Sequence, residues 1–304
     1  MLIRSVNNRA IVFTTFAVLV GISALTLGSC ASSSKSLRPR SWRADSVLRS
    51  EVRPLLNALE QGDFVQIETA LSSNKAPADN PYFSVAQSLV QLVKTIQSVE
   101  SQIDETFRNE KTWSDSFFTK AYALVAEADA GLATSDMLLE KAQGYRSLKW
   151  VSTPGSWAID WNKNGKISTR ERDRLKFLFD ESGRFLPKSD PRRAPTVAFD
   201  QSDVYWLRSY IAFARSALMF FQSYDWSILG RLMNGDHGMA SLAALQIRVP
   251  IRDRTLANAL GQHLRGGITL AQQSRQLIAA ETDSDREWVP SPTQTGATPH
   301  SARP

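Results

Sequence analysis

The stretch VAQSLVQLVKTIQSVESQIDETF, residues 85–107, decides the fold class. Its large apolar side chains recur every three or four residues, at Val85, Leu89, Leu92, Ile96, Val99, Ile103 and Phe107. This spacing puts them on one face of an α-helix of about 25 residues. We therefore expect a long amphipathic helix that packs this face into a core.

The same spacing extends over most of the chain. Residues 44–150 look helical throughout, with a kink or break at Pro54 and a helix end at Gly62 followed by an N-cap at Asp63. A C-terminal helical region, 200–288, starts with a capping box at Asp200 and Asp203, which opens a buried helix from 201 to about 222. A tail helix follows from 253 to about 281, with a kink expected at residues 266–267.

The prediction is an all-α fold, either a multi-helix bundle or an array of helical hairpins. No stretch alternates with period two for long enough to predict a sheet. Residues 289–304 hold four prolines and no apolar run, so we expect a disordered C-terminal tail.

Composition excludes several classes of protein and site. Apolar residues make up 42% and charged residues 22% of the 304 residues, which is typical of a globular protein. A single Cys cannot form a disulfide framework or a thiolate zinc site. None of the three His lies four residues from another, so the helical His-pair zinc motif is absent from the sequence.

The N-terminus has the three parts of a secretory signal. Arg4 and Arg9 precede an apolar run from Ala10 to Leu27, and small residues close it. The sequence Leu27-Gly28-Ser29-Cys30 resembles the bacterial lipobox. This resemblance implies that residues 1–29 are a lipoprotein signal peptide, and that Cys30 becomes the N-terminus and is acylated with chains such as palmitate. The alternative is an uncleaved membrane anchor, for which the run is marginally long enough.

The resemblance also implies a location. Residues 30–43 form a Ser-rich, basic tether from the lipid to the folded chain. Ala31 follows Cys30 in place of the Asp that retains such proteins at the inner membrane, which favours the outer membrane or cell surface. Without Arg4 and Arg9 the net charge falls from +6 to +4. That charge is small and spread along the chain, so we expect no nucleic-acid partner.

Between the two helical regions, residues 151–199 contain the one motif with chemistry. The stretch DWNKNGKISTRE, residues 160–171, resembles the EF-hand calcium loop at all twelve positions. The resemblance implies a Ca²⁺ site with ligands from Asp160, Asn162, Asn164, the Lys166 carbonyl, Ser168 and Glu171, the last through both carboxylate oxygens. The alternative is an Asn-Gly turn followed by a capped helix, because Ser168 and Glu171 also fit a capping box.

The motif departs from a complete EF-hand in two ways. Residues 152–156 cannot form a regular incoming helix, so we expect a loop followed by one helix, 169 to about 181, and then a Pro-rich connection. Only Asp160 and Glu171 are anionic ligands, and cationic residues surround them. We therefore expect weak binding, with a Kd of ~10⁻⁴ to 10⁻³ M.

No catalytic constellation stands out. Residues 282–287 form an acidic run without the glycine of a calcium loop, and we expect a solvated helix end there. His237 and His263 lack a nucleophile motif nearby. The first hypothesis is an anchored, calcium-binding envelope scaffold with an unknown protein or glycan partner. The alternative is a calcium-stabilised envelope hydrolase whose acids are unidentified, with the carboxylates near Trp157 and Trp161 as its only lead.

Overall fold

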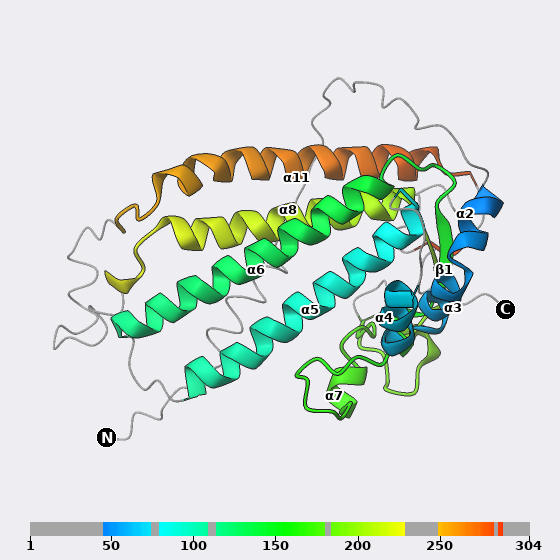
Figure 1. The fold of residues 1–304 in the computed structure, drawn as a ribbon, viewed down its shortest axis with the longest axis horizontal. Coiled ribbons are helices and arrows are strands. Elements are labelled where there is room, and N and C mark those ends of the chain that lie inside the picture. The colour runs from blue at the N-terminus through cyan, green and yellow to red at the C-terminus, as the bar shows by residue number, and fades with distance from the viewer. Residues whose placement is uncertain are drawn as a thin grey trace.

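The computed structural model of the protein describes residues 45–73, 79–108, 114–179, 184–228, 249–282 and 285–287. Four long helices dominate it: α5 (Pro81–Arg108), α6 (Asp115–Ala142), α8 (Gln201–Ser223) and α11 (Arg254–Ala280). They lie side by side in the order α5, α6, α8, α11 and alternate in direction (Figure 1). The predicted all-α fold is confirmed, in the form of an up-and-down helical array.

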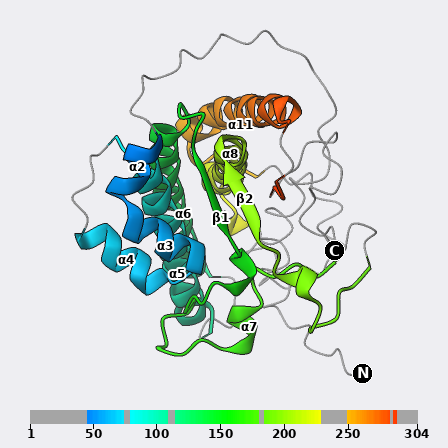
Figure 2. The same ribbon diagram turned by 90° about the vertical axis from the view of Figure 1, so that its right-hand side faces the viewer.

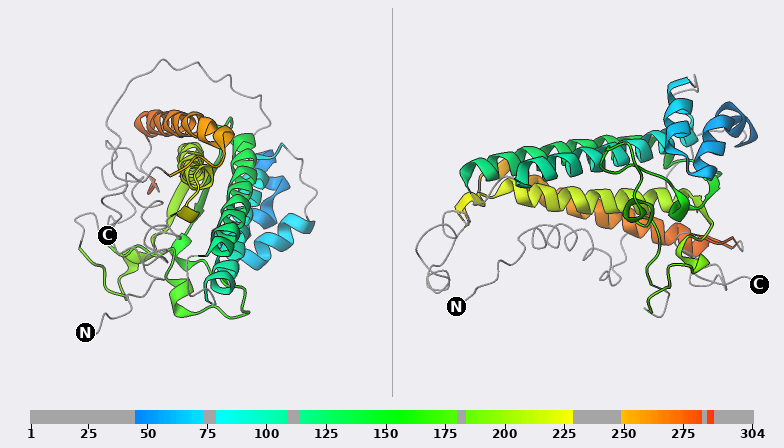
Figure 3. Two further views of the ribbon diagram at one scale, coloured as in Figure 1. Left: turned by 90° about the vertical axis from the view of Figure 1, so that its left-hand side faces the viewer. Right: turned by 90° about the horizontal axis from the view of Figure 1, so that it is seen from below.

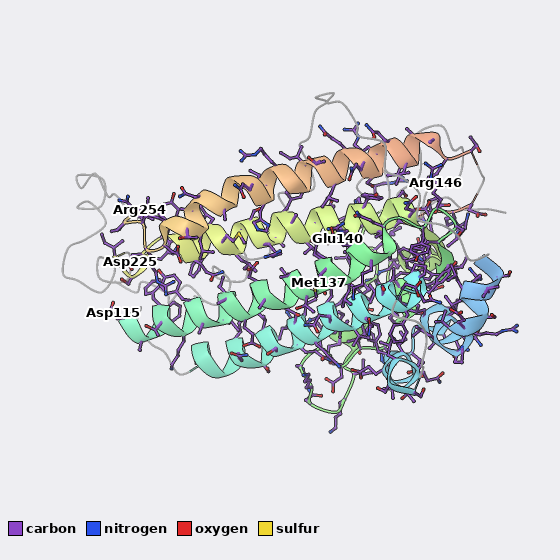
Figure 4. The ribbon with its side chains drawn as sticks, turned by 45° about the horizontal axis from the view of Figure 1, so that its top comes forward. Asp115, Met137, Glu140, Arg146, Asp225 and Arg254 are labelled. Carbon is purple, nitrogen blue, oxygen red and sulfur yellow. The ribbon has the colours of Figure 1, made fainter. Side chains whose placement is uncertain are left out.

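The ends of the long helices alternate between the two ends of the molecule. Asp115, Asp225 and Arg254 lie together at one end, and Arg146 lies at the other (Figure 4). Ion pairs join the central helices: Arg208 Nε lies 2.6 Å from Asp136 Oδ1, and Arg215 Nε lies 2.8 Å from Asp129 Oδ1. These pairs explain how α8 carries two arginines and still packs against α6 and α11.

Three short helices cover one end of α5. They are α2 (Asp45–Glu51), α3 (Arg53–Gln61) and α4 (Phe64–Ser73). The helix break expected at Pro54 is present. Pro54 lies in the first turn of α3, where a backbone N–H has no partner within the helix, so the missing N–H of proline costs nothing. Gly62 ends α3 in the left-handed conformation, with φ at 70°, and Asp63 Oδ1 accepts the N–H of Gln66 at 3.0 Å. Both predicted helix boundaries are confirmed.

Two strands that the sequence pattern did not predict lie at the same end (Figure 2). β1 (Lys149–Ser152) pairs antiparallel with β2 (Val197–Asp200), and the rings of Trp150 and Phe199 stack with their centroids 5.0 Å apart. Four-residue strands are too short to show an alternating pattern. Their pairing joins the two ends of the connection that carries the motif loop.

One other expectation is wrong. The helix after the loop, α7, spans only Thr169–Arg172, and not 169 to about 181. Downstream, residues 173–176 continue in turns, and the N–H of Phe177 donates to Arg193 O at 2.8 Å and not to a helical carbonyl four residues earlier. α11 continues through Gly266 and Gly267 without a break, as one helix that packs along α8 (Figure 3), and the expected kink there stays a prediction.

None of the described helices is long and apolar enough to cross a membrane. The leader and the whole tether, residues 1–43, lie outside the described residues, as does the tail 289–304. The predictions for Cys30 and for a disordered tail therefore stay predictions.

Candidate metal centre

The motif loop is held against the N-terminal helices by two buried tryptophans. Trp157 packs edge-on against Phe64, with ring centroids 5.4 Å apart, and its Nε1 donates to Ser152 Oγ at 3.0 Å. Trp161 is also buried, and the guanidinium of Arg174 lies 5.3 Å from its ring centroid. These side chains belong to the core, so they offer no aromatic surface to a glycan. The hydrolase alternative, whose lead was the carboxylates near Trp157 and Trp161, stays a prediction.

Two left-handed residues curl the loop. Lys163 has φ at 56° and Gly165 has φ at 79°. Gly165 adopts this angle without strain, whereas a side chain there would cost free energy. The resulting curl turns the backbone N–H groups of Asn164, Gly165 and Lys166 toward the oxygens of the motif.

The first three expected ligands converge on that curl. Asp160 Oδ1 and Asn162 Oδ1 both accept the N–H of Asn164, each at 3.1 Å. Asp160 Oδ2 accepts the N–H of Gly165 at 2.7 Å, and Asn164 Oδ1 accepts the N–H of Lys166 at 2.8 Å. Three hard oxygen donors are thus gathered on one side of the loop. Lys166 enters this network through its N–H, and the ligand role expected for its carbonyl stays a prediction.

Glu171 closes the loop from the other side. Its Oε2 accepts the N–H and the hydroxyl of Ser168, at 2.8 and 2.7 Å, and its Oε1 accepts the N–H of Asn162 at 3.3 Å. The side chain is only 4% exposed. Burial by itself raises the pKa of this carboxyl, but the hydrogen bonds from Ser168, Asn162 and Trp161 outweigh it, and the net pKa is lowered. Glu171 is therefore held as a carboxylate, the form that binds a cation.

The loop has features of both interpretations left open by the sequence, a calcium loop and a capped turn. Ser168 and Glu171 form a reciprocal capping box at the start of α7. The same Glu171 also reaches back to Asn162, nine residues earlier, which a simple capped turn does not require. The donor set of two carboxylates, two amides and a hydroxyl consists of hard oxygens, which suit Ca²⁺. Within the described part of the chain, no group of three or more His, Cys, Asp or Glu is placed to hold a metal.

A second group of acids lies far from the loop, where the sequence did not place a site. Asp203, at the start of α8, is buried, and its Oδ1 has no hydrogen-bond partner. Burial, followed by the charge of Asp200, raises the pKa of Asp203 well above its usual range. Burial and the charge of Asp200 also raise the pKa of Glu281, at the end of α11, to about 8.

The third element of this group comes from the acidic run near the C-terminus. Glu287 is only 3% exposed, because the backbone around it pairs with β2: the N–H of Ala198 donates to Arg286 O at 2.7 Å. The expectation of a solvated helix end is therefore wrong for Glu287. Sequence reasoning identified Asp200 and Asp203 as a helix cap, and the structure confirms that cap. Nothing in the local pattern indicated that Glu281 and Glu287 lie beside it.

His263 lies on α11 and is partly exposed, with no described acid or nucleophile bonded to it, whereas His237 falls outside the described residues. Comparison with models of protein families, with curated proteins and with solved structures finds no match to this chain.

Proposed function

We propose that this protein is a lipid-anchored lipoprotein of the bacterial cell envelope that binds one Ca²⁺ through residues 160–171 and serves as a structural or binding module. The single observation that carries the calcium part is the convergence of the expected ligands. Asp160 and Asn162 share one backbone N–H, and Glu171 closes on Asn162 from the far side. Ca²⁺ would be held by these side-chain oxygens, which have further lone pairs besides those that accept the backbone N–H groups.

The anchoring part rests on the sequence alone. The only Cys of the chain is the residue at which the lipobox-like motif ends. Several acyl chains hold a protein stably at a bilayer, where a single chain gives only marginal binding. An envelope location also suits a weak calcium site, because extracellular modules work at ~10⁻⁴ to 10⁻³ M calcium.

A binding or scaffold role is preferred to hydrolysis. The acids with a raised pKa, Asp203 and Glu281, are the groups most like a catalytic acid. Asp203 and Glu287 are nevertheless buried among packed elements, where a substrate could not reach them. The partner proposed for the module is a protein or glycan of the envelope.

Calorimetry and melting curves with calcium and with chelator test the calcium site. With a Kd of ~1 mM, 1 mM calcium stabilises the fold by only about 0.4 kcal/mol, and 10 mM by about 1.4 kcal/mol. Asp160→Asn and Glu171→Gln keep the shape of the ligand but remove its charge, so each should abolish most of the calcium-dependent shift. Magnesium should do less.

The matched control is Asp190→Asn. Asp190 caps the turn at Pro191–Arg193 in the same connection but is not an expected ligand. This variant should lower the melting temperature without changing the calcium-dependent shift. Equal curves with calcium and with chelator for the wild-type protein, up to 10 mM ion, would show that the motif is only a capped turn.

Mass spectrometry of the protein purified from its own envelope tests the anchor. We expect a chain that starts at an acylated Cys30, and an uncleaved precursor for Cys30→Ser. An unmodified Cys30 in the native protein would refute the anchor while leaving the calcium site untouched.

A further inference from the structure

Directly after α7 the chain makes a hairpin with an unusual surface. Phe179 pairs with Phe185 in an antiparallel bridge, and the N–H of Leu186 donates to Leu178 O at 2.8 Å. The two phenylalanine rings meet edge to face, with centroids 5.9 Å apart. We call Leu178, Phe179, Phe185 and Leu186 the aromatic hairpin.

Only one of these four side chains is in the core. Leu186 is 1% exposed, whereas Leu178, Phe179 and Phe185 are 44%, 54% and 62% exposed. A single exposed apolar side chain is ordinary in a globular protein, but three on one hairpin make a patch. Such patches mark contacts with another surface.

The base of the hairpin is fixed to the body of the protein. The N–H of Phe177 donates to Arg193 O, and Arg193 Nε donates to Phe177 O at 3.2 Å. The guanidinium of Arg193 is buried and lies 4.0 Å from Asp173. The exposed rings are therefore presented by a held backbone, which lowers the conformational entropy lost when they bind.

Around the hairpin, acidic and basic side chains differ in how far they are exposed. Within residues 160–179 and 184–193 every carboxylate is at least partly buried: Asp160, Glu171, Asp173 and Asp190. Each accepts hydrogen bonds or an ion pair from this same segment. The exposed charged residues described in these two ranges are all cationic: Lys163, Lys166, Arg170, Arg172, Arg174, Arg184 and Lys188. Arg174 is paired with Glu100 of α5. Among its described residues, the segment that carries the exposed rings thus exposes positive charge.

We propose that the aromatic hairpin and its cationic neighbours form a second membrane contact, which docks onto the headgroup region of an anionic bilayer. Aromatic rings with lysine and arginine around them suit this region, because the rings enter the boundary with the acyl chains while the cations stay among the phosphates. Each cation near an anionic surface strengthens binding roughly fivefold. Exposed aromatic and arginine side chains would also suit a protein partner, and a hairpin that no lipid quencher reaches is the result that would favour one.

The contact is shallow. Asp180 and Glu181 follow Phe179 in the sequence, outside the described residues, and their charges are not tolerated in the hydrocarbon core. The proposal deepens the proposed anchoring at the membrane, because a chain held at Cys30 keeps this face within reach of the bilayer. It does not require calcium to be bound.

The test measures whether the hairpin touches lipid in the full chain. Cys30→Ser removes the only native thiol, and Phe179→Cys then takes an environment-sensitive fluorescent label. The matched control carries the label at Val65→Cys on α4, a position that is 74% exposed and belongs neither to the aromatic hairpin nor to its cationic neighbours. Both chains are reconstituted into phosphatidylcholine vesicles with and without phosphatidylglycerol, with bromine quenchers on the lipids, either near the headgroup or deep in the acyl chains.

We expect the label at position 179 to be quenched at least twofold more in the anionic vesicles, and more by shallow than by deep bromines. The label at position 65 should remain unquenched. Arg172→Gln with Lys188→Gln should reduce the quenching, whereas Arg254→Gln with Arg265→Gln, on exposed positions of α11, should not. Raising the salt to 1 M should also reduce it, because the Debye length falls to about 3 Å.

Three results would overturn the proposal: no quenching at position 179 in any vesicle, equal quenching at positions 179 and 65, or equal quenching in neutral and anionic vesicles. These outcomes are distinct from a failure of the proposed function. An unacylated Cys30 with a quenched hairpin refutes the lipid anchor alone, and an acylated Cys30 with an unquenched hairpin refutes this second contact alone.

Discussion

At the scale of single residues, two glutamates show how the fold sets opposite charge states. Glu171 is almost completely buried, yet donors from Ser168, Asn162 and Trp161 keep its pKa below the usual range. Glu281 faces Asp200 and Glu287, and burial together with these charges raises its pKa to about 8. The difference lies in what surrounds each carboxyl: N–H donors in the loop, and other carboxylates at the end of α11.

Glu281 leads to a prediction about pH. Below pH 4.5 the carboxyl is protonated in both the folded and the unfolded chain, so it contributes no pH dependence. As the pH rises, the unfolded chain releases this proton first, so the free energy of unfolding falls until about pH 8. Glu281→Gln should remove this loss. Against wild type, the variant should gain about 1–2 kcal/mol between pH 5 and pH 8, less than the full linkage value because the residue as a whole is partly exposed and nearby solvent screens the charges.

The measurement is urea unfolding at intervals across that range. Glu127→Gln is the control of opposite sign, because hydrogen bonds from Ser98 and Gln102 lower the pKa of Glu127. Removing Glu127 should cost some stability above its usual pKa. If the difference between Glu281→Gln and wild type were constant from pH 5 to pH 8, then Glu281 would titrate normally and the acid group would not be coupled.

Residues close in sequence could be assigned from sequence, and distant ones could not. Ser168 and Glu171 are three residues apart, as are Asp200 and Asp203, so each capping box follows from local spacing. Asp203 and Glu281 are 78 residues apart, and only the packing of α8 against α11 brings them together. The candidate calcium ligands could be named because the twelve-residue loop is itself local.

At the scale of elements, the two adjacent glycines of α11 provide a second prediction. A Cβ added at Gly266 would meet nothing within 4 Å, whereas one at Gly267 would lie 2.9 Å from Phe213 Cε1 on α8. Gly266→Ala should stabilise the protein by about 0.5–1 kcal/mol, because alanine is the better helix former. Gly267→Ala should destabilise it by about 1–3 kcal/mol, because the helices must move apart.

Thermal or denaturant unfolding of the two variants checks this prediction, and each serves as the control for the other. Stabilisation by both substitutions would mean that α11 does not approach α8 as closely as the structure has it. Destabilisation by both would indicate that α11 needs glycine backbone angles at this position, as the kink expected from the sequence would.

Helix starts were more predictable than helix lengths. Gly62, Asp63 and Asp200 act within one turn of the boundary that they set, so the sequence predicts those boundaries correctly. The chain after α7 does not continue as a helix. There, Phe177 exchanges hydrogen bonds with Arg193, which lies 16 residues away in the sequence. The β1–β2 pair similarly joins residues 149–152 to 197–200. No local pattern reports such partners.

At the scale of the whole molecule, the motif loop is attached to the helical array at a few defined points. Gln97 Nε2 on α5 donates to Asp160 O at 2.7 Å, and the guanidinium of Arg174 donates to both carboxylate oxygens of Glu100. Trp157 fixes the start of the loop against Phe64 of α4. α11 lies on the other side of the array, beyond α6 and α8 (Figure 1). Calcium should therefore stabilise the structure unevenly.

Hydrogen exchange measures that unevenness. Amides that exchange only when the ion site is broken should slow by a factor of about 1 + [Ca²⁺]/Kd, roughly tenfold at 10 mM ion for a Kd of ~1 mM. We expect this protection in residues 160–172 and in the middle of α5 around Gln97, and little of it in α11. Gln97→Ala should keep the protection of the loop but reduce that of α5, because the side chain that joins them is gone. Asp160→Asn should abolish both effects.

Two outcomes would contradict this prediction. Equal protection in α5 and α11 would mean that the loop opens only with global unfolding. Protection confined to the loop in the wild-type protein would mean that Gln97 and Arg174 do not transmit the stabilisation.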